Sequence, residues 1–173
     1  MIELRDAQFL DYAAISKLHS ESWRQNYRGI LSDNFLDFEV EKVHSDIWKK
    51  RFQSPGKSQQ ITLATLNKSI VGFSCLLLDD DLFFGSLLDN LHVLTNEQKT
   101  GIGKLLMQNC ARIIYEECGN KNIYLWVYEL NKNARSFYER LGGTKYETIE
   151  KQNIDGTKAQ ACRYIWNDVS LII

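Results

Sequence analysis

The chain reads Leu87-Leu-Asp-Asn-Leu-His-Val93, then Leu-Thr-Asn-Glu-Gln98-Lys-Thr-Gly101-Ile-Gly103-Lys104, followed by an amphipathic segment. This pattern predicts a strand, a polar loop and the start of a helix. Gly101 and Gly103 stand where the helix begins, although each glycine costs about 1 kcal/mol of helix propensity relative to alanine. Close approach of a phosphate would explain both glycines, because the free amides of a first helical turn and the helix dipole form an anion site. Lys99 and Lys104 add positive charge beside it.

Two common phosphate-binding loops do not fit these glycines. A Walker loop needs a glycine five positions before Gly103 and a serine or threonine two positions after it, where this chain has Gln98 and Leu105. The dinucleotide fingerprint needs a third glycine where Leu106 stands. What remains is a glycine loop directly after a strand that ends at Val93.

The Gln98-x-x-Gly101-x-Gly103 loop closely resembles the acetyl-CoA pyrophosphate loop of the GNAT-superfamily N-acetyltransferases. A second motif follows at the distance and in the order expected of that family. It reads Asn131-Lys-Asn-Ala134-Arg-Ser-Phe137-Tyr138-Glu-Arg-Leu-Gly142-Gly143. This is similar to the family's Asn-x-x-Ala-x-x-Phe-Tyr-x-x-x-Gly-Phe helix, and the apolar segment 123–128 precedes it as a strand should.

Two positions depart from the family pattern. Thr95 stands where proline is common, and Gly143 stands where an aromatic residue usually follows Gly142. Glycine supplies no side chain to bury. We therefore expect looser packing beneath the last strands.

The resemblance implies an α/β fold with a GNAT-like, mostly antiparallel sheet of six to seven strands flanked by about four helices. The hydrophobic pattern predicts strands at 2–5, 60–66, 70–78, 87–93, 123–128, 145–152 and 158–166. Helices are expected from Asp11 to about 26, from 40 to 52 after a short helix beginning at Ser32, from about 101 to 118, and after Asn131. Asn67-Lys68 and Ile154-Asp155-Gly156 predict hairpin turns.

Composition points to one domain over residues 1–173. The chain is 44% hydrophobic and 25% charged and has one proline, which is typical of a compact protein. It holds no apolar run of the roughly 18 residues that a membrane span needs, so we expect a cytoplasmic protein that does not enter membranes. A net charge of -1 disfavours a nucleic-acid partner. We expect a monomer or a homodimer.

The four cysteines are scattered without the pair spacing of a metal site. They are Cys75, Cys110, Cys118 and Cys162. We interpret them as buried thiols and expect no bound metal. None stands in a motif suited to a covalent acyl-enzyme, which would need an activated thiolate and a partner base.

The resemblance implies acetyl-CoA as the co-substrate. Pantetheine would pair with the main chain of residues 91–93, and a backbone amide at about Val93 would polarise the thioester carbonyl. Asn131 is a natural helix cap and, by resemblance, also lies near the cofactor. The implied cofactor-binding residues are Leu91, His92, Val93, Gln98, Lys99, Thr100, Gly101, Ile102, Gly103, Lys104, Asn131 and Tyr138.

Tyr138 has two interpretations. Its spacing with Ala134, Phe137 and Leu141 is that of a core residue on one helix face. The match to the family's Phe-Tyr pair implies instead a general acid for the sulfur of coenzyme A. Full proton transfer from a phenol with a pKa near 10 to a thiolate whose thiol pKa is near 8.5 is uphill by roughly 2 kcal/mol. Tyr138 would therefore donate as the C–S bond breaks, or hydrogen-bond the sulfur.

The base that deprotonates the acceptor is sought on the strand that ends at Val93. Period-two alternation places Leu87, Asp89, Leu91 and Val93 on one face, and His92 on the other. The superfamily often carries a base at the position of Leu87 or Asp89, and leucine cannot serve. Asp89 is the first candidate, acting through water, with an ion-paired or solvated carboxylate as the alternative. His92 ranks second, because it reaches the same face only if a bulge turns it.

The acceptor groove is expected near Trp23 and Tyr27, which lie four residues apart on a predicted helix, and near Trp126 and Asp89. Large aromatic residues at helical spacing are equally typical of a core. The leading hypothesis is an N-acetyltransferase that uses direct attack on a primary amine of a small molecule or peptide. Alternatives are a non-catalytic acyl-CoA-binding sensor or interaction module, and an enzyme acting on charged tRNA, which the net charge disfavours.

Overall fold

The computed structural model describes residues 1–56 and 58–173. Its helices are α1 (Tyr12–Asn26), α2 (Val40–Gln53), α3 (Ile102–Glu117) and α4 (Lys132–Arg140). Its strands are β1 (Ile2–Asp6), β2 (Gln59–Leu66), β3 (Ser69–Asp81), β4 (Gly85–Val93), β5 (Ile123–Tyr128), β6 (Thr144–Gln152) and β7 (Lys158–Trp166). A π-type helical segment, Phe35–Glu39, leads into α2. None of the helices in this part of the chain is long and apolar enough to span a membrane.

The strands form one sheet in the order β1-β2-β3-β4-β5-β7-β6. All neighbours pair antiparallel except β4 and β5, which are parallel. The β2–β3 hairpin turns at Asn67 and Lys68, which both adopt positive φ angles of 50° and 67°. The predicted α/β fold with a mostly antiparallel sheet is confirmed.

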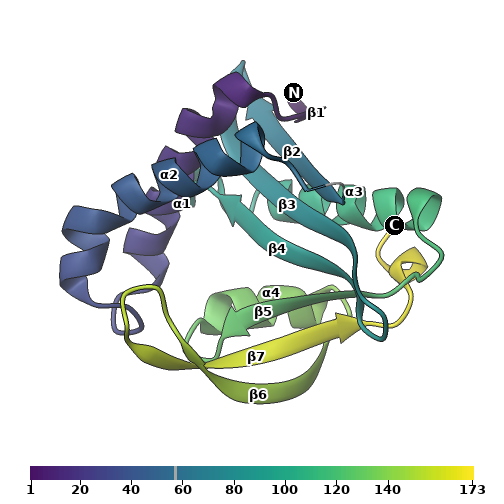
Figure 1. The fold of residues 1–173 in the computed structure, drawn as a ribbon. Coiled ribbons are helices and arrows are strands. Elements are labelled where there is room, and N and C mark those ends of the chain that lie inside the picture. Colours follow the sequence, from purple (N-terminus) through teal and green to yellow (C-terminus); the bar gives the residue numbers. More distant parts are fainter. Residues whose placement is uncertain (57) are drawn as a thin grey trace.

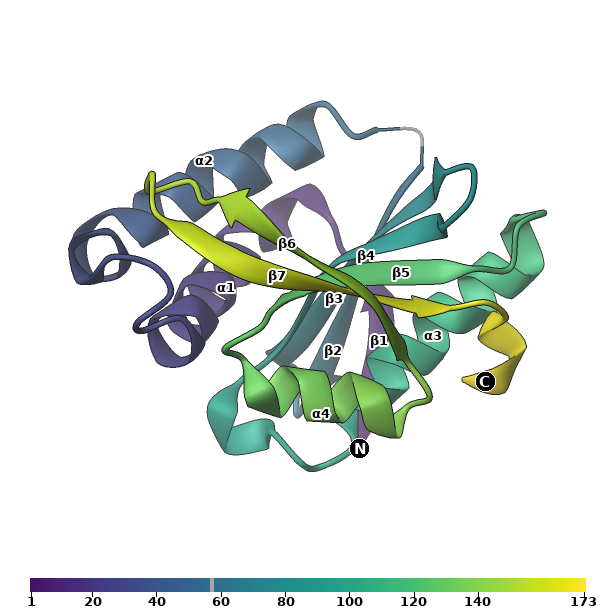
Figure 2. The same cartoon turned by 90° about the horizontal axis from the view of Figure 1, so that it is seen from below.

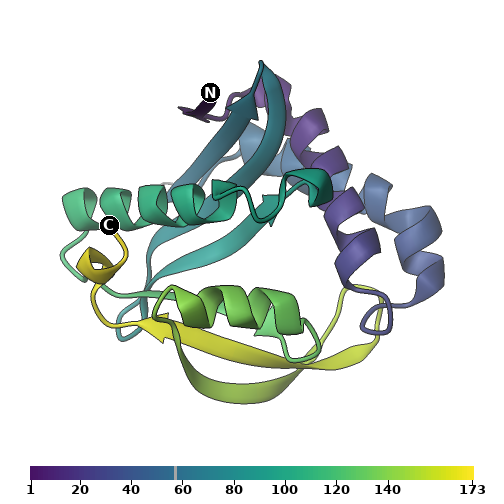
Figure 3. The ribbon, with the colours of Figure 1, turned by 180° about the vertical axis from the view of Figure 1, so that it is seen from behind.

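The helices cover the two faces of the sheet in pairs. Figure 1 shows α1 and α2 over one face, and the reverse view in Figure 3 shows α3 and α4 over the other. The α1/α2 side buries Ile15, Trp48, Leu63 and Phe73 in one cluster. The α3/α4 side buries a larger cluster that includes Met107 and residues of β5 and β7. The last two strands continue the sheet past β5, as the view from below shows (Figure 2).

The two parallel strands at the centre of the sheet pair over a very short length. Ser86 of β4 pairs with Ile123 of β5, and Leu87 pairs with Tyr124. No further β4–β5 pairing occurs in the described structure, and Figure 1 shows the two strands diverging. The sheet therefore opens into a wedge between the C-terminal half of β4 and β5.

Gly143 does not loosen the packing, so that expectation is wrong. A Cβ atom added at Gly143 would lie 2.5 Å from Cζ2 of Trp166, a distance that real Cβ atoms do not show. Trp166 is 3% exposed, and its indole N–H donates to the carbonyl of Leu141 at 2.9 Å. The indole ring therefore fills the space that an aromatic side chain at position 143 would otherwise occupy.

Candidate active site

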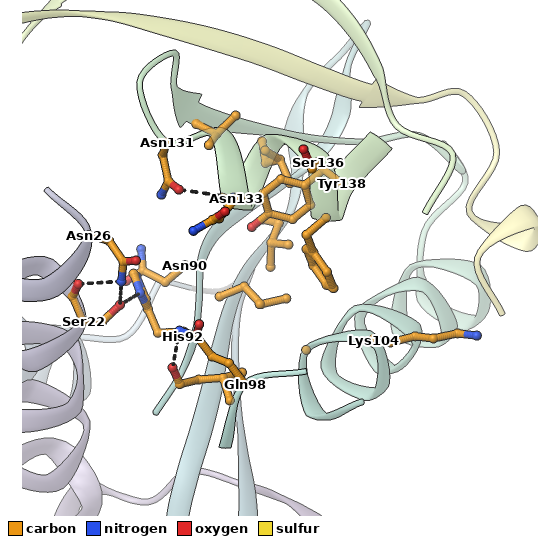
Figure 4. A pocket seen from close by; sticks show the side chains of 18 of the residues that line it. Ser22, Asn26, Asn90, His92, Gln98, Lys104, Asn131, Asn133, Ser136 and Tyr138 are labelled. Carbon is orange, nitrogen blue, oxygen red and sulfur yellow. Dashed lines mark hydrogen bonds between the residues drawn. The ribbon is translucent and has the colours of Figure 1, made fainter. Parts of the chain in front are cut away.

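A cavity of about 630 Å³ lies in the wedge between β4 and β5. Its walls come from residues 88–93 of β4, 125–127 of β5, the loop before α3, and parts of α1 and α4. Figure 4 shows polar side chains from these elements around one space, with Ser22 and Asn26 of α1 opposite Asn131 and Asn133 near α4. Elements that are far apart in the sequence, such as α1 and α4, thus contribute to one cavity.

The main chain of β4 faces the cavity with hydrogen-bonding groups that no neighbouring strand uses. The amide of Leu94 donates to the carbonyl of Val71 on the β3 side, at 2.9 Å. Because alternate residues of an antiparallel strand bond to the same neighbour, the main-chain groups of Leu91 and Val93 point the other way, into the wedge. Their side chains pack beside Ile102 on the α3 face. Core packing by the side chains and ligand binding by the main chain are therefore compatible.

The loop before α3 presents the first amides of that helix. Gly101 occupies the N-cap position with φ +94°, and no side chain caps the helix start. Lys99 also has positive φ, at 64°, and Gln98 donates through Nε2 to the carbonyl of Val93 at 3.3 Å. With no side chain bonded to them, the first-turn amides remain available for an anion.

The two glycines of this loop serve different purposes. At position 101 the left-handed backbone conformation favours glycine. Space does not require it, because a Cβ atom there would meet nothing within 4 Å. A Cβ at Gly103 would lie 3.2 Å from Cζ of Phe137, so this glycine is required for packing of α3 against α4. Ligand approach, the reason expected from the sequence, is not needed to explain either residue.

Three other members of the predicted loop contribute differently from one another. Ile102 is 1% exposed and belongs to the core, and Thr100 donates its hydroxyl to the carbonyl of Glu97 at 2.6 Å. Neither side chain lines the cavity, so any contact from these two residues must come from the main chain. The Lys104 side chain extends away from the other labelled residues (Figure 4).

Tyr138 is both a core residue and a cavity residue. It is 8% exposed and packs in the α3/α4 cluster, yet it lines the cavity. Figure 4 shows its hydroxyl end turned toward the interior of the cavity. Burial raises the pKa of the phenol, with a smaller contribution from Cys110, so Tyr138 is protonated at neutral pH. Its hydroxyl has no hydrogen-bond partner among residues 1–56 and 58–173.

Asn131 caps α4 as its sequence position suggested. Its Oδ1 accepts a hydrogen bond from the amide of Ala134 at 3.2 Å. The residue also lies on the cavity wall, so the cap and a ligand contact are compatible. The cavity side chains that sequence reasoning missed include Ser22, Asn26 and Asn90, whose polar character carries no motif.

A β-bulge at Asp89 overturns the predicted alternation along β4. Cys75 of β3 pairs with Asn90 and the next residue pairs with Leu88, which leaves Asp89 without a partner. Asp89 consequently points to the α1/α2 face, where its Oδ2 forms a 2.6 Å ion pair with Nη2 of Arg51. His92 lies on that same face. The prediction that Asp89 shares a face with Leu91, opposite His92, is wrong, because a bulge shifts the alternation by one residue.

All three histidines of the chain meet beside this wall. The rings of His19 and His44 stack at 3.8 Å with an angle of 2° between them, and His92 lies 4.5 Å from His19. Ser22 Oγ hydrogen-bonds Nδ1 of His92 at 2.8 Å. Burial lowers the pKa of His44 to about 4 and that of His92 to about 3, and it lowers the pKa of His19 as well. The cluster is therefore uncharged at neutral pH.

The histidine cluster was not predicted from the sequence. Its signal is faint: His19 precedes Trp23, and His44 precedes Trp48, each by four residues, which places each pair on one helix face. Trp48 donates its indole N–H to Nδ1 of His19 at 3.1 Å. No group of three metal-binding side chains suited to an ion occurs in the described part of the chain.

The aromatic residues predicted for the acceptor groove separate into two kinds. Trp23 packs against His44 and Phe35 and does not line the cavity, so the core interpretation holds for it. Tyr27 and Trp126 do line the cavity. Tyr27 is held edge-on against Tyr128, with ring centroids 4.9 Å apart.

The four cysteines are buried free thiols, as predicted. Burial raises the pKa of the Cys75 thiol to about 12 and that of Cys110 to about 11. Both thiols therefore stay protonated near neutral pH, which makes them poor nucleophiles. This is consistent with the expectation that no cysteine carries an acyl group.

Comparisons with known proteins agree with this geometry. The chain is 24% identical to the uncharacterized N-acetyltransferase YuaI of Bacillus subtilis, over 99% of this chain and 96% of that protein. It is 27% identical to the probable N-acetyltransferase Rv2775 of Mycobacterium tuberculosis, over 80% and 78% of the two chains. The crystal structure of the PaiA N-acetyltransferase of Thermoplasma acidophilum in complex with coenzyme A superposes with a TM-score of 0.73 at 20% identity, covering 94% of this chain and 98% of that one.

The family model that matches this sequence covers residues 14–143, and both motifs quoted above fall within that range. The match begins in α1 and ends after α4, so it takes in the wedge, the loop before α3 and the cavity between them. On this evidence the chain belongs to the acetyltransferase (GNAT) family.

Proposed function

We propose that this protein transfers the acetyl group of acetyl-CoA to a primary amine, with both substrates bound and no acyl-enzyme. The observation that carries the proposal is the wedge itself, in which main-chain groups of Leu91 and Val93 that no neighbouring strand uses share one cavity with the Tyr138 phenol. Two curated relatives described as N-acetyltransferases, and a structural neighbour solved with coenzyme A, support it.

The residues present fit the two ends of acetyl-CoA. The uncapped first turn of α3 after Gly101 and the nearby Lys99 suit a pyrophosphate, because they combine free amides with positive charge. The β4 main chain suits pantetheine, whose amides can pair with it as an added strand would. Asn131 and Gln98 also line the cavity.

We assign the polarisation of the thioester carbonyl to the amide of Val93, which donates to the oxygen as negative charge develops there. The amine nitrogen then bonds to the carbonyl carbon, and the C–S bond breaks. An ammonium acceptor gives up two protons in all, one to the departing sulfur and one to solvent. Tyr138 donates a hydrogen bond to that sulfur. Its raised pKa favours hydrogen bonding over complete proton transfer.

We assign deprotonation of the acceptor to Asp89 through water. Asp89 lies on the cavity wall, and its ion pair with Arg51 engages Oδ2, which leaves Oδ1 for a water molecule. His92 is the second candidate, since the bulge brings it to the same face. Its ring is uncharged, but Nδ1 is already occupied by Ser22, which makes it a weaker choice.

Thiol release in the presence of acetyl-CoA and a panel of primary amines tests the proposal. We expect release that requires both the protein and an amine, together with an acetylated amine in mass spectrometry. Binding of acetyl-CoA without release under any amine would support the sensor alternative. The Asp89→Asn and His92→Gln variants separate the two candidate bases. At low pH the acceptor is mostly an ammonium ion, so the variant that lacks the true base should lose the most turnover there.

A further inference from the structure

The cations near Asp89 and Trp126 are unequally matched with carboxylates. Arg51 pairs with Asp89, and Nη2 of Arg163 lies 2.9 Å from Oε1 of Glu147. Lys151 of β6 has no carboxylate within 4.0 Å of its ammonium among residues 1–56 and 58–173. One cation in this region is therefore left without an anionic partner.

Lys151 packs on the ring of Trp126, a residue of the cavity wall. Its Nζ lies 3.6 Å from the centre of the Trp126 ring, and the Arg163 guanidinium lies 4.5 Å from the same centre. Trp126 lines the cavity together with Asp89. The ring thus fixes an ammonium group beside the wall at which the acceptor amine is proposed to be deprotonated.

The electrostatic surroundings of Lys151 are those of a cation that lacks an anion. Burial and the nearby Arg163 lower its pKa, and the more distant carboxylates of Asp89 and Glu147 offset this in part. A bound anion would restore the balance by Coulombic attraction in a partly desolvated place. A second ammonium group on the acceptor would instead be repelled by Lys151 and Arg163.

We infer that the amine acceptor carries an anionic group, a carboxylate or a phosphate, which Lys151 binds at the edge of Trp126 while the amine lies toward Asp89. This inference rests on the proposed function and names the class of its second substrate. It makes Lys151 a residue that determines specificity. It also places polyamines among the poor acceptors.

Three amines of matched length test the inference: 4-aminobutanoate, 1-aminobutane and 1,4-diaminobutane. We expect kcat/KM to fall in that order, with about a tenfold preference for the carboxylate over the neutral amine. Lys151→Gln should remove the preference, and Lys151→Arg should retain most of it. Lys158→Gln, which alters an exposed cation on β7 paired with Glu150, is the matched control and should leave the preference unchanged. Aminoethyl phosphate against ethanolamine distinguishes phosphate from carboxylate.

Binding of the same amines to the protein loaded with coenzyme A, measured by calorimetry, separates this inference from the proposed function. Amine-dependent thiol release without a preference for the anionic acceptors, or with a preference that survives Lys151→Gln, overturns the inference and leaves the function standing. Binding of an anionic amine that depends on Lys151, without thiol release, overturns the function and supports only the part of the inference that gives Lys151 an anionic ligand. If the protein shows no preference for anionic amines in binding and no thiol release, both the inference and the proposed function are overturned.

Discussion

The two walls of the wedge are built on different principles. The wall proposed for the cofactor, called the cofactor wall below, consists of main-chain groups of β4 and the uncapped start of α3, and its side chains are largely occupied with core packing. The wall proposed for the acceptor consists of the side chains of Asp89, His92 and Trp126. Behind it lie Arg51, the other two histidines of the cluster, and the two cations on the Trp126 ring. A wall made of backbone tolerates many sequences, whereas a wall made of side chains is specific to this chain.

The histidine cluster beside the acceptor wall should lower the stability of the folded protein in acid. The three histidines of the cluster are buried and uncharged, and their folded pKa values lie below the ordinary histidine value of about 6.5, so the unfolded chain binds more protons as the pH falls below 6.5. Stability is therefore complete above pH 6.5 and is lost toward pH 4. We expect the free energy of unfolding in urea to fall by up to about 6 kcal/mol between pH 8 and pH 5, or about 2 kcal/mol for each histidine.

The His44→Gln variant tests whether the histidine cluster causes this loss of stability. His44→Gln should reduce the difference in stability between pH 8 and pH 5 by about 1 to 2 kcal/mol, because one fewer group takes up a proton on unfolding. A pH difference unchanged by this substitution would show that the histidines are not its source.

Tyr138→Phe is expected to act on chemistry and not on the cofactor wall. Losing the hydrogen bond to the departing sulfur should lower kcat about 100-fold, which corresponds to roughly 2.7 kcal/mol. The dissociation constant for acetyl-CoA should change less than twofold, as judged by calorimetry. Tyr115→Phe, on the exposed side of α3, is the control. Unchanged turnover in Tyr138→Phe would remove this residue from the mechanism.

Arg51→Ala should disturb the acceptor wall alone. The substitution leaves the partly buried Asp89 unpaired and removes the guanidinium contacts with the Trp48 ring and the Cys75 sulfur. We expect a loss of about 2 kcal/mol of stability. This is less than the loss expected for breaking a fully buried ion pair, because both side chains keep some exposure to solvent. Acetyl-CoA affinity should stay within twofold of the original. Lys42→Ala, in an exposed pair with Asp46, should cost less than about 0.5 kcal/mol.

Gly101→Ala is the corresponding change in the cofactor wall and should have the smallest effect. A left-handed φ of +94° is unfavourable for alanine and costs about 1 kcal/mol. Relaxation of the loop should weaken acetyl-CoA binding by about fivefold. Gly119→Ala, where neither a positive φ nor a close neighbour constrains the residue, is the control. Equal effects of the two substitutions would contradict the role given to the Gly101 backbone.

The two walls also differ in how well sequence predicted them. The positions of the loop, of the helix cap at Asn131 and of strand β4 follow from local motifs, because secondary structure depends strongly on nearby residues. The orientation of Asp89 depends on one bulge against β3, and the partners Arg51 and Lys151 come from distant elements. Likewise, the space at Gly143 is filled by Trp166, which lies 23 positions away in the printed sequence. Such pairings depend on tertiary contacts that no short motif records.

A crystal structure of the protein with acetyl-CoA tests the central claim most directly. We predict that the pyrophosphate contacts the main-chain amides of residues 99–104, that the thioester carbonyl faces the amide of Val93, and that the sulfur lies within hydrogen-bonding reach of the Tyr138 hydroxyl. Acetyl-CoA bound outside the wedge, or bound there with its sulfur remote from Tyr138, would contradict the account.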